Sequence, residues 1–263
     1  MDYKHGTVLS TRRICKSYNN RQILNDVSFE VKRGEIFVIM GGSGCGKSTL
    51  LRIMAGGVIP TSGEIIFDSR DIGTIAGYEK EKVRRRFGMS FQSAALLDSL
   101  TVEENVSLPI KEHTRLNSEV IHIIAMMKLK LAGLQGFESY MPSELSGGMK
   151  KRAGLARAIA LDPEIVFYDE PTAGLDPVAC AVIDRLILDL TKKLNITSIV
   201  VTHNMESVFR IADRVAMLYK GELLQVGTVE EIKNSKDPIV QQFINGEIEG
   251  PIQMEDKIAE AVY

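Results

Sequence analysis

An apolar strand, a glycine-rich loop and a helix follow one another directly in the first quarter of this chain. Ile36 to Met40 is a continuous apolar run of the kind that forms a buried strand, and Ser48 to Ala55 has a helical pattern that Gly56 ends. The loop between them, Gly41 to Ser48, has the spacing G-x-x-x-x-G-K-S. Glycines there let backbone N–H groups and the helix N-terminus point at one anion. The segment therefore predicts a phosphate-binding loop for ATP or GTP within an α/β protein.

Residue types in this loop fit distinct parts of a nucleotide. Lys47 is placed to reach the β- and γ-phosphates, the Ser48 hydroxyl to take one position on Mg²⁺, and Thr49 to contact the α-phosphate. The residues expected to bind the nucleotide here are Gly41, Gly42, Ser43, Gly44, Cys45, Gly46, Lys47, Ser48 and Thr49.

An acidic pair, Asp169 and Glu170, ends a second apolar run, Ile165 to Tyr168. A carboxylate at the carboxyl end of a buried strand lies beside the phosphate site in this topology, so Asp169 is expected to hold Mg²⁺ through water. Glu170 would then face the γ-phosphate and act as the base for the attacking water. An acidic pair at a strand end can also cap the next segment, but the phosphate loop favours the catalytic interpretation.

The remaining pattern predicts a parallel-sheet core with a helical insertion. Residues from Val8 to Met40 alternate as strands, those from Ser93 to Leu161 are helical, and strands alternate with helices after Ile165. In the insertion, Thr101 and Glu104 form a capping box. A stripe ended by Gly133 is expected to face the core: Val120, Ile124, Met127 and Leu131.

A long helix and two end segments complete the pattern. Asp176 and Pro177 start a helix that precedes the strand Ile196 to Thr202, and Met149 to Leu161 is a basic helix. Met1 to Tyr18 reads as a strand and not as a secretory signal.

Composition excludes several classes of protein. The chain of 263 residues has a net charge of −2, so it lacks the overall positive charge that would favour binding to nucleic acid. Its three cysteines are scattered and suit a reducing cytoplasm. No apolar run approaches the roughly 20 residues of a membrane helix. If the protein serves a membrane, another chain is expected to cross it.

Leu145-Ser146-Gly147-Gly148-Met149 indicates which kind of nucleotide protein this is. Taken alone, it is a helix N-cap with two glycines. Between a phosphate loop and an acidic strand end, it resembles the signature of ATP-binding-cassette (ABC) proteins. The resemblance implies an ABC ATPase of the P-loop NTPase class, with an N-terminal antiparallel β subdomain and a helical signature subdomain. It also implies that Ser146, Gly147 and Gly148 bind the γ-phosphate of ATP held by a second copy, with Met149 in place of the usual glutamine.

Further residues match the family in order. The resemblance makes Gln92 the Q-loop residue that touches Mg²⁺ or the attacking water, and His203 the switch residue that contacts the γ-phosphate. Tyr18 would stack on adenine, and Ala173 to Asp176 would form the D-loop. Without the resemblance, the alternative interpretations of these three residues are an ordinary loop glutamine, a strand-end histidine and a core tyrosine. The ABC ATPase domain is expected over residues 1–235, with its helical subdomain at about 93–161, and a C-terminal extension over 236–263.

Other segments look like the ATPases of MCE-type lipid transporters, above all the Mla phospholipid system: Leu108 to Thr114, Met141 to Glu144, and the tail from Asp237 to Phe243 with Gly250 and Pro251. Helical-lobe surface and a disordered C-terminus are the alternatives. The resemblance implies a homodimeric ATPase, peripheral on the cytoplasmic face of the inner membrane. Its partners would be a transmembrane permease subunit (MlaE-like), an MCE-domain lipid-binding protein and a small STAS-domain protein.

The tail is expected to form a short helix from Asp237, with Phe243 and the Gly250-Pro251 region packed on the partner ATPase and residues beyond Gln253 frayed.

Other functions remain as alternatives. ABC proteins that act on ribosomes fuse two cassettes, and those that repair DNA insert a coiled coil; neither pattern occurs here. A regulatory module without turnover would be expected to lack Lys47, Glu170 or His203, and all three are present. The ATPase of a small-solute importer or of a lipoprotein-release system is the main alternative.

Overall fold

The strand before the phosphate loop lies in the middle of a six-stranded sheet. The structure is a computed structural model that describes residues 6–253. All neighbouring strands of this sheet are parallel except β9 and β10, which pair antiparallel at one edge. In spatial order the strands are β10 (Glu222–Thr228), β9 (Arg214–Tyr219), β3 (Ile36–Met40), β8 (Thr197–Thr202), β7 (Ile165–Asp169) and β6 (Phe87–Ser90). Every residue of β3, β7 and β8 is buried, as expected for parallel strands covered on both faces.

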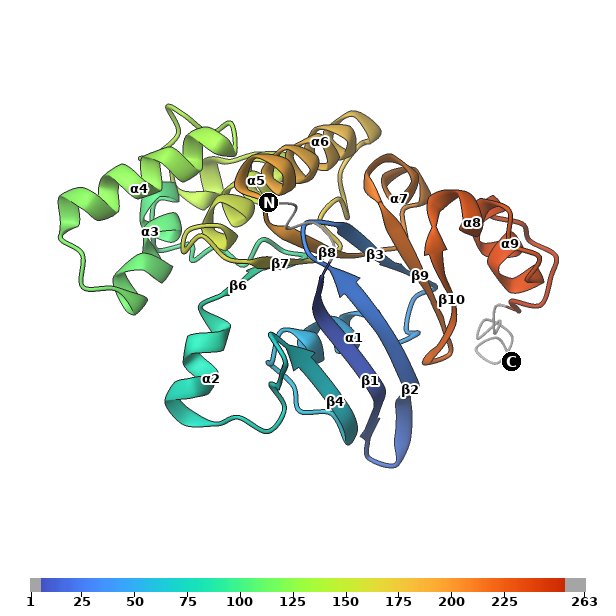
Figure 1. Ribbon diagram of the computed structural model, residues 1–263. Helices are drawn as coiled ribbons and strands as arrows, with labels where there is room; N and C mark the ends of the chain where they lie inside the picture. The colour runs from blue at the N-terminus through green and yellow to red at the C-terminus, as the bar shows by residue number, and fades with distance from the viewer. Residues whose placement is uncertain (1–5, 254–263) are drawn as a thin grey trace, which may run out of the picture.

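Helices cover one face of this sheet (Figure 1). They are α5 (Gly147–Ala158), α6 (Pro177–Leu194) and α7 (Met205–Ile211), with α8 (Val229–Lys233) and α9 (Pro238–Asn245) beside the β10 edge. Their apolar sides form one core with alternate residues of the strands, including Val38, Tyr168 and Val200. Asp176 caps α6 and Pro177 begins it, as predicted.

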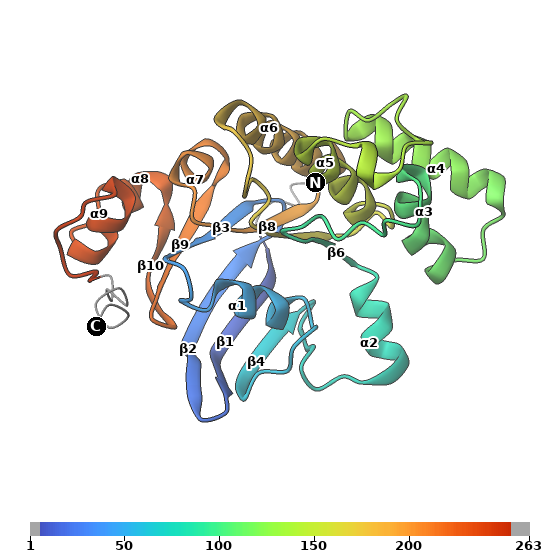
Figure 2. The same ribbon diagram turned by 180° about the vertical axis from the view of Figure 1, so that it is seen from behind.

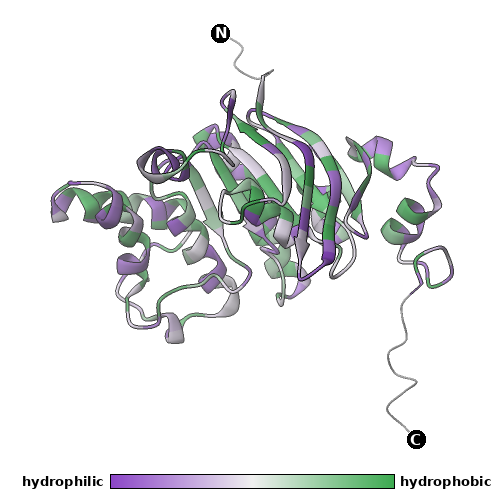
Figure 3. Cartoon of the chain, turned by 90° about the horizontal axis from the view of Figure 1, so that it is seen from below, coloured by the Kyte–Doolittle hydropathy of each residue, from purple (hydrophilic) through white to green (hydrophobic). Residues whose placement is uncertain are grey.

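A four-stranded antiparallel sheet and helix α1 lie on the other face (Figure 2). The sheet contains β2 (Arg21–Lys32), β1 (Thr7–Tyr18), β4 (Ser62–Phe67) and β5 (Arg70–Asp71), and the helices on this side are α1 (Lys47–Met54) and α2 (Gly77–Arg84). Apolar residues gather along these strands and α1 (Figure 3). They enclose a second core with residues such as Phe37, Leu50 and Phe167. The predicted antiparallel β subdomain and parallel core are therefore confirmed.

The helical insertion forms a lobe at the β6 side of the sheet (Figure 1). It consists of α3 (Val102–His113), α4 (Ser118–Leu131), the 3₁₀ turn Pro142–Glu144 and the start of α5. The predicted capping box between Thr101 and Glu104 is present at the start of α3. A third apolar core lies between α3, α4 and α5.

The predicted core stripe of α4 is wrong by one position. Val120 is exposed, Met127 is 60% exposed, and Ile124 and Leu131 are only half-buried. The buried side carries Ile121, Ala125, Leu129 and Ala132 instead. Because α4 is apolar on nearly all sides, its periodicity does not select a face.

The C-terminal helix packs on its own chain. Asp237 caps α9 by accepting hydrogen bonds from the N–H groups of Ile239 and Val240, which confirms the predicted start. Val240 is fully buried, and Phe243 packs partly against the core that α6 and α7 share with the sheet. The helix therefore buries Val240 within its own chain, and the packing of the partly buried Phe243 on a partner chain stays a prediction.

Two expectations fall wholly or partly outside the described residues. The frayed end beyond Gln253 lies outside them, and so does the first part of the strand expected over Met1 to Tyr18. Between residues 6 and 253, none of the helices has the length and apolarity to cross a membrane.

Candidate functional site

The phosphate loop has a backbone that only glycine fits at two of its positions. Gly41 has φ 151°, and a Cβ there would lie 2.1 Å from the carbonyl oxygen of Leu218. Gly46, which caps α1, has φ 105°, and its Cβ would meet Leu24 at 2.8 Å. The Lys47 ammonium lies inside the loop and donates hydrogen bonds to the carbonyls of Gly41 at 2.8 Å and Gly42 at 2.9 Å. The loop thus has the form of an anion cradle with its cation in place.

Oxygen ligands suited to Mg²⁺ lie beside this loop. The Ser48 hydroxyl donates a hydrogen bond of 2.9 Å to the Asp169 carboxylate at the end of β7. Gln92 lines the same cavity as Asp169, together with Arg52 and Ser93. Hydroxyl, carboxylate and amide oxygens are hard ligands of the kind Mg²⁺ prefers, and Mg²⁺ usually fills its remaining positions with water and phosphate. The residues present therefore fit this ion.

Glu170 and His203 form a hydrogen-bonded pair next to Asp169. The Nδ1 atom of His203 lies 2.9 Å from Oε1 of Glu170, and the Glu170 N–H donates to the carbonyl of Val201. The Glu170 side chain is nearly buried, whereas that of His203 is more than half exposed. Glu170 also has a left-handed backbone with φ 48°, which is strained for a residue with a side chain. Such strain persists where neighbouring groups hold it, and it is common at catalytic positions.

Tyr18 stands at the edge of the phosphate-loop cavity. It ends β1, is half exposed, and carries the Lys16 ammonium 4.7 Å from its ring centre. The cavity also includes Arg21 and Ile23, which sequence reasoning missed. Arg21 pairs directly with Tyr18 across the β1–β2 hairpin, so the Asn19-Asn20 turn was the signal that would have found it.

The signature residues line a further cavity, apart from the one at Tyr18 and the phosphate loop. Ser146 caps α5, and its hydroxyl accepts a hydrogen bond from the N–H of Met149. This cavity is lined by Ser146, Gly147, Gly148 and Asp176, among others, and shares no residue with the cavity at Tyr18 and the phosphate loop. Met149 packs against the core of the helical lobe. The methionine therefore anchors the start of α5, and the hydroxyl and backbone donors of the signature remain.

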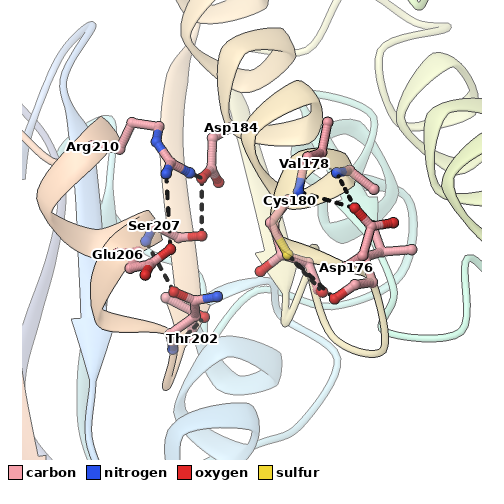
Figure 4. A network of polar contacts seen from close by, with 12 residues as sticks. Asp176, Val178, Cys180, Asp184, Thr202, Glu206, Ser207 and Arg210 are labelled. Carbon is pink, nitrogen blue, oxygen red and sulfur yellow. Dashed lines mark hydrogen bonds and ion pairs between the residues drawn. The ribbon is translucent and has the colours of Figure 1, made fainter.

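A buried polar network connects the segments after Asp176 and His203 (Figure 4). Asp184 on α6 accepts hydrogen bonds from Ser207 at 2.9 Å and from Arg210 at 2.5 Å, both on α7. Burial raises the pKa of Asp184, and these two hydrogen bonds oppose that shift. The Cys180 thiol on α6 is 3.6 Å from the carbonyls of Thr172 and Leu175. Asp184 was missed because its only sequence signal is one carboxylate in an otherwise apolar helix face.

Comparisons with known proteins agree with this geometry. The family model described as ABC transporter matches residues 24–173. The intermembrane phospholipid transport ATP-binding protein MlaF of Haemophilus influenzae is 44% identical over 94% of this chain and 93% of its own. A probable ribonucleotide transport ATP-binding protein, mkl of Mycobacterium tuberculosis strain H37Rv, is 40% identical over 97% of this chain and 71% of its own.

A solved structure supports the same assignment. The dimeric cassette MJ0796 in a post-hydrolysis state, bound to ADP and Pi, superposes with a TM-score of 0.78 at 33% identity, covering 84% of this chain and 98% of that one. The phosphate loop, the acidic strand end and the signature occur together in one fold, and both sequence and structure match the family. The chain therefore belongs to the ABC transporter family and is an ATP-hydrolysing cassette.

Proposed function

We propose that this chain is the ATPase subunit of an Mla-type phospholipid transporter, and that two copies of it close on two ATP molecules. The observation that carries the transport assignment is the extent of similarity to proteins named for phospholipid transport. Identity of 40–44% extends over 94–96% of this chain, well beyond the matched cassette region 24–173. The mycobacterial relatives, named for probable ribonucleotide transport, keep a small-solute transporter as the second candidate.

The homodimer is supported by the separation of two partial sites on one chain. The phosphate-loop cavity offers a cation, glycine N–H groups and Tyr18, while the signature cavity offers a capped helix N-terminus. Helix N-termini bind anions because their N–H groups are unsatisfied and their dipole is positive. In a head-to-tail pair, the signature N-terminus of one chain would complete the γ-phosphate site of the other. The cassette MJ0796 was solved as a dimer in a post-hydrolysis state, bound to ADP and Pi.

Hydrolysis in such a site requires a base, a charge clamp and an oriented water. Lys47 would leave the Gly41 and Gly42 carbonyls for the β- and γ-phosphates, and Ser48 with Asp169 would hold Mg²⁺, joined by Gln92. Bound Mg²⁺ would neutralise charge on the phosphate oxygens. Glu170 would accept the proton of the attacking water, and His203 would orient that carboxylate and contact the γ-phosphate.

The membrane part of the system is proposed to lie on other chains. The ATPase would sit as a peripheral subunit on the cytoplasmic face of the inner membrane and drive a permease subunit. An MCE-domain protein and a STAS-domain protein are the further partners that the Mla resemblance implies.

Purification of the whole complex tests this function. A tagged copy of the chain, expressed with its neighbouring genes, is expected to copurify with a permease and an MCE protein and to carry phospholipid detectable by mass spectrometry. ATP should drive transfer of labelled phospholipid between the complex and vesicles, and a Glu170→Gln complex should not support it. Copurification with a solute-binding protein and no phospholipid would favour the small-solute alternative.

A further inference from the structure

Two cationic side chains of the signature helix α5, the buried Lys151 and the partly buried Arg157, are bound only by backbone carbonyls. Lys151 is 9% exposed, and its ammonium donates to the carbonyl of Gln92 at 2.5 Å and to that of Glu170 at 3.3 Å. Arg157 donates to the carbonyls of Ala94 and Ala95, both at 2.7 Å. Neither cation forms an ion pair with a residue in the range 6–253. Burial lowers the pKa of Lys151, an effect that the nearby Glu170 partly offsets.

Three of the four carbonyls that these cations bind belong to residues with a strained backbone. Glu170, Ala94 and Ala95 all have left-handed φ angles, at 48°, 61° and 47°. Residues with side chains avoid this region unless neighbouring groups hold them there. A buried cation is itself costly unless hydrogen bonds satisfy it. The same contacts therefore hold the backbone and satisfy the cations. In the case of Lys151, the two residues held are Gln92 and Glu170, both of the proposed catalytic set.

Lys151 also connects two parts of the chain that face different nucleotides. It lies on the second turn of α5, whose capped N-terminus at Ser146 opens to the signature cavity. Glu170 lies beside the chain's own phosphate loop, next to Asp169. One ammonium thus joins the helix that would bind the partner's ATP to the backbone of Glu170, whose carboxylate would act on the chain's own ATP.

We propose that Lys151 is a positioning residue for hydrolysis, which holds the backbone of Glu170 and Gln92 in place and makes their position depend on the signature helix. The inference rests on the proposed two-site dimer. When α5 docks on the partner's ATP, Lys151 transmits the position of that helix to the base at the chain's own site. Loss of the ammonium leaves the phosphate loop and the signature cavity intact and removes the link between them.

Lys151→Met tests this role in the full-length ATPase purified with its membrane subunits. The methionine keeps the length and most of the volume of the side chain and removes its donor. We expect ATP binding within about twofold of wild type and a fall in kcat of about tenfold or more, because small displacements of a catalytic group are costly. An ATP-bound dimer should accumulate with Mg²⁺ and ATP, as for Glu170→Gln. Lys151→Arg, which restores a cationic donor, should recover most of the rate.

Lys150→Met is the matched control, since it removes the same charge from the adjacent position. Lys150 is half-exposed, makes no side-chain hydrogen bond or ion pair to the described residues, and should give wild-type kcat. If Lys151→Met does not fold, Lys151→Gln replaces it as a shorter, neutral donor and should lower kcat while keeping the trapped dimer. A wild-type kcat in either variant would overturn the proposal. Loss of the ATP-bound dimer would overturn it too, because it would show that Lys151 only supports signature docking.

The Glu170→Gln reference separates this inference from the proposed function. If Glu170→Gln itself forms no ATP-bound dimer, the two-site dimer is wrong, whatever Lys151 does. If Glu170→Gln traps the dimer and Lys151→Met hydrolyses ATP at the wild-type rate, only the positioning role is wrong.

Discussion

Glu170 receives contacts from three different parts of the fold. His203 binds its carboxylate, Val201 accepts its N–H, and Lys151 binds its carbonyl. Side chains held in this way keep their orientation during a reaction, which is the basis of preorganised catalysis. Substitution of the carboxylate should therefore affect chemistry without disturbing the surrounding backbone.

Glu170→Gln is expected to retain ATP binding and to lose turnover by about a hundredfold or more, because the amide fills the same space but cannot accept the proton of water. Steady-state hydrolysis by the assembled complex and equilibrium binding of labelled ATP measure the two quantities. A rate close to wild type would show that another group is the base.

Lys47→Ala should act at the earlier step of nucleotide binding. It removes the cation now held by the carbonyls of Gly41 and Gly42, and charge-assisted hydrogen bonds to phosphate would be lost with it. We expect ATP affinity to fall by about tenfold or more, the equivalent of one or two such hydrogen bonds. Labelled ATP titrated into the purified chain gives the value. Unchanged affinity and hydrolysis together would remove the phosphate-loop assignment.

The residues of the motifs could be predicted because a short stretch of sequence is enough to identify each motif. The spacing of Gly41, Gly46 and Lys47 defines the loop, and Asp169 follows directly from a buried strand. Lys151 and Asp184 could not be predicted, because their partners lie far along the chain and meet them only in the folded sheet and helices.

Helix starts that are fixed by a capping residue were predicted better than the buried face of an apolar helix. The start of α6 at Asp176 and the cap of α3 at Thr101 agree with the structure, since capping residues act on their own helix. The prediction of which α4 residues are buried was wrong. Packing against α3 and α5 decides which face is buried, and the sequence of α4 alone does not. The sequence of α9 does not show that Val240 is buried within the chain, whereas the partly buried Phe243 leaves the predicted contact with a partner open to test.

The N-terminus of α5 gives the prediction that belongs to this scale. Ser146→Arg should leave ATP binding to the single chain intact and lower hydrolysis by about a hundredfold, because a bulky cation would fill the cavity that we propose receives the partner's γ-phosphate. Ser143→Arg is the control, since it adds the same charge at an exposed position outside that cavity.

Mixed dimers sharpen the test of α5. A Ser146→Arg chain paired with a Lys47→Ala chain would have one site with both changes and one with neither. Some hydrolysis should return in this mixture relative to either variant alone. Wild-type hydrolysis by Ser146→Arg homodimers would contradict the role of the signature across the dimer.

At the scale of the whole molecule, the fold leaves the C-terminal loop beyond α9 directed outward. Buried Gln242 shapes this loop by hydrogen bonds to the backbone of Glu247 and Ile252, and a side chain at Gly250 would meet Gln242 at 2.4 Å. Ile248 is 96% exposed. The loop therefore has a defined shape, but its apolar residue Ile248 does not pack against the core of its own chain.

Two truncations separate the roles of α9 and this loop. Removal of residues after Gly246 keeps α9 and should leave the melting temperature and ATP binding unchanged. It should weaken assembly of the ATPase dimer in the transporter, because we predict from the Mla resemblance that the tail packs on the neighbouring ATPase. Removal after Asn234 also deletes α9 and should lower the free energy of unfolding by about 1–3 kcal/mol, since the buried Val240 and the half-buried Phe243 are lost from the core. Chemical denaturation measures the stability, and size-exclusion chromatography of the complex measures the assembly. If the shorter deletion assembled and transported lipid as well as the full chain, the exposed loop would have no part in the dimer, and the tail would give no support to the lipid-transporter assignment.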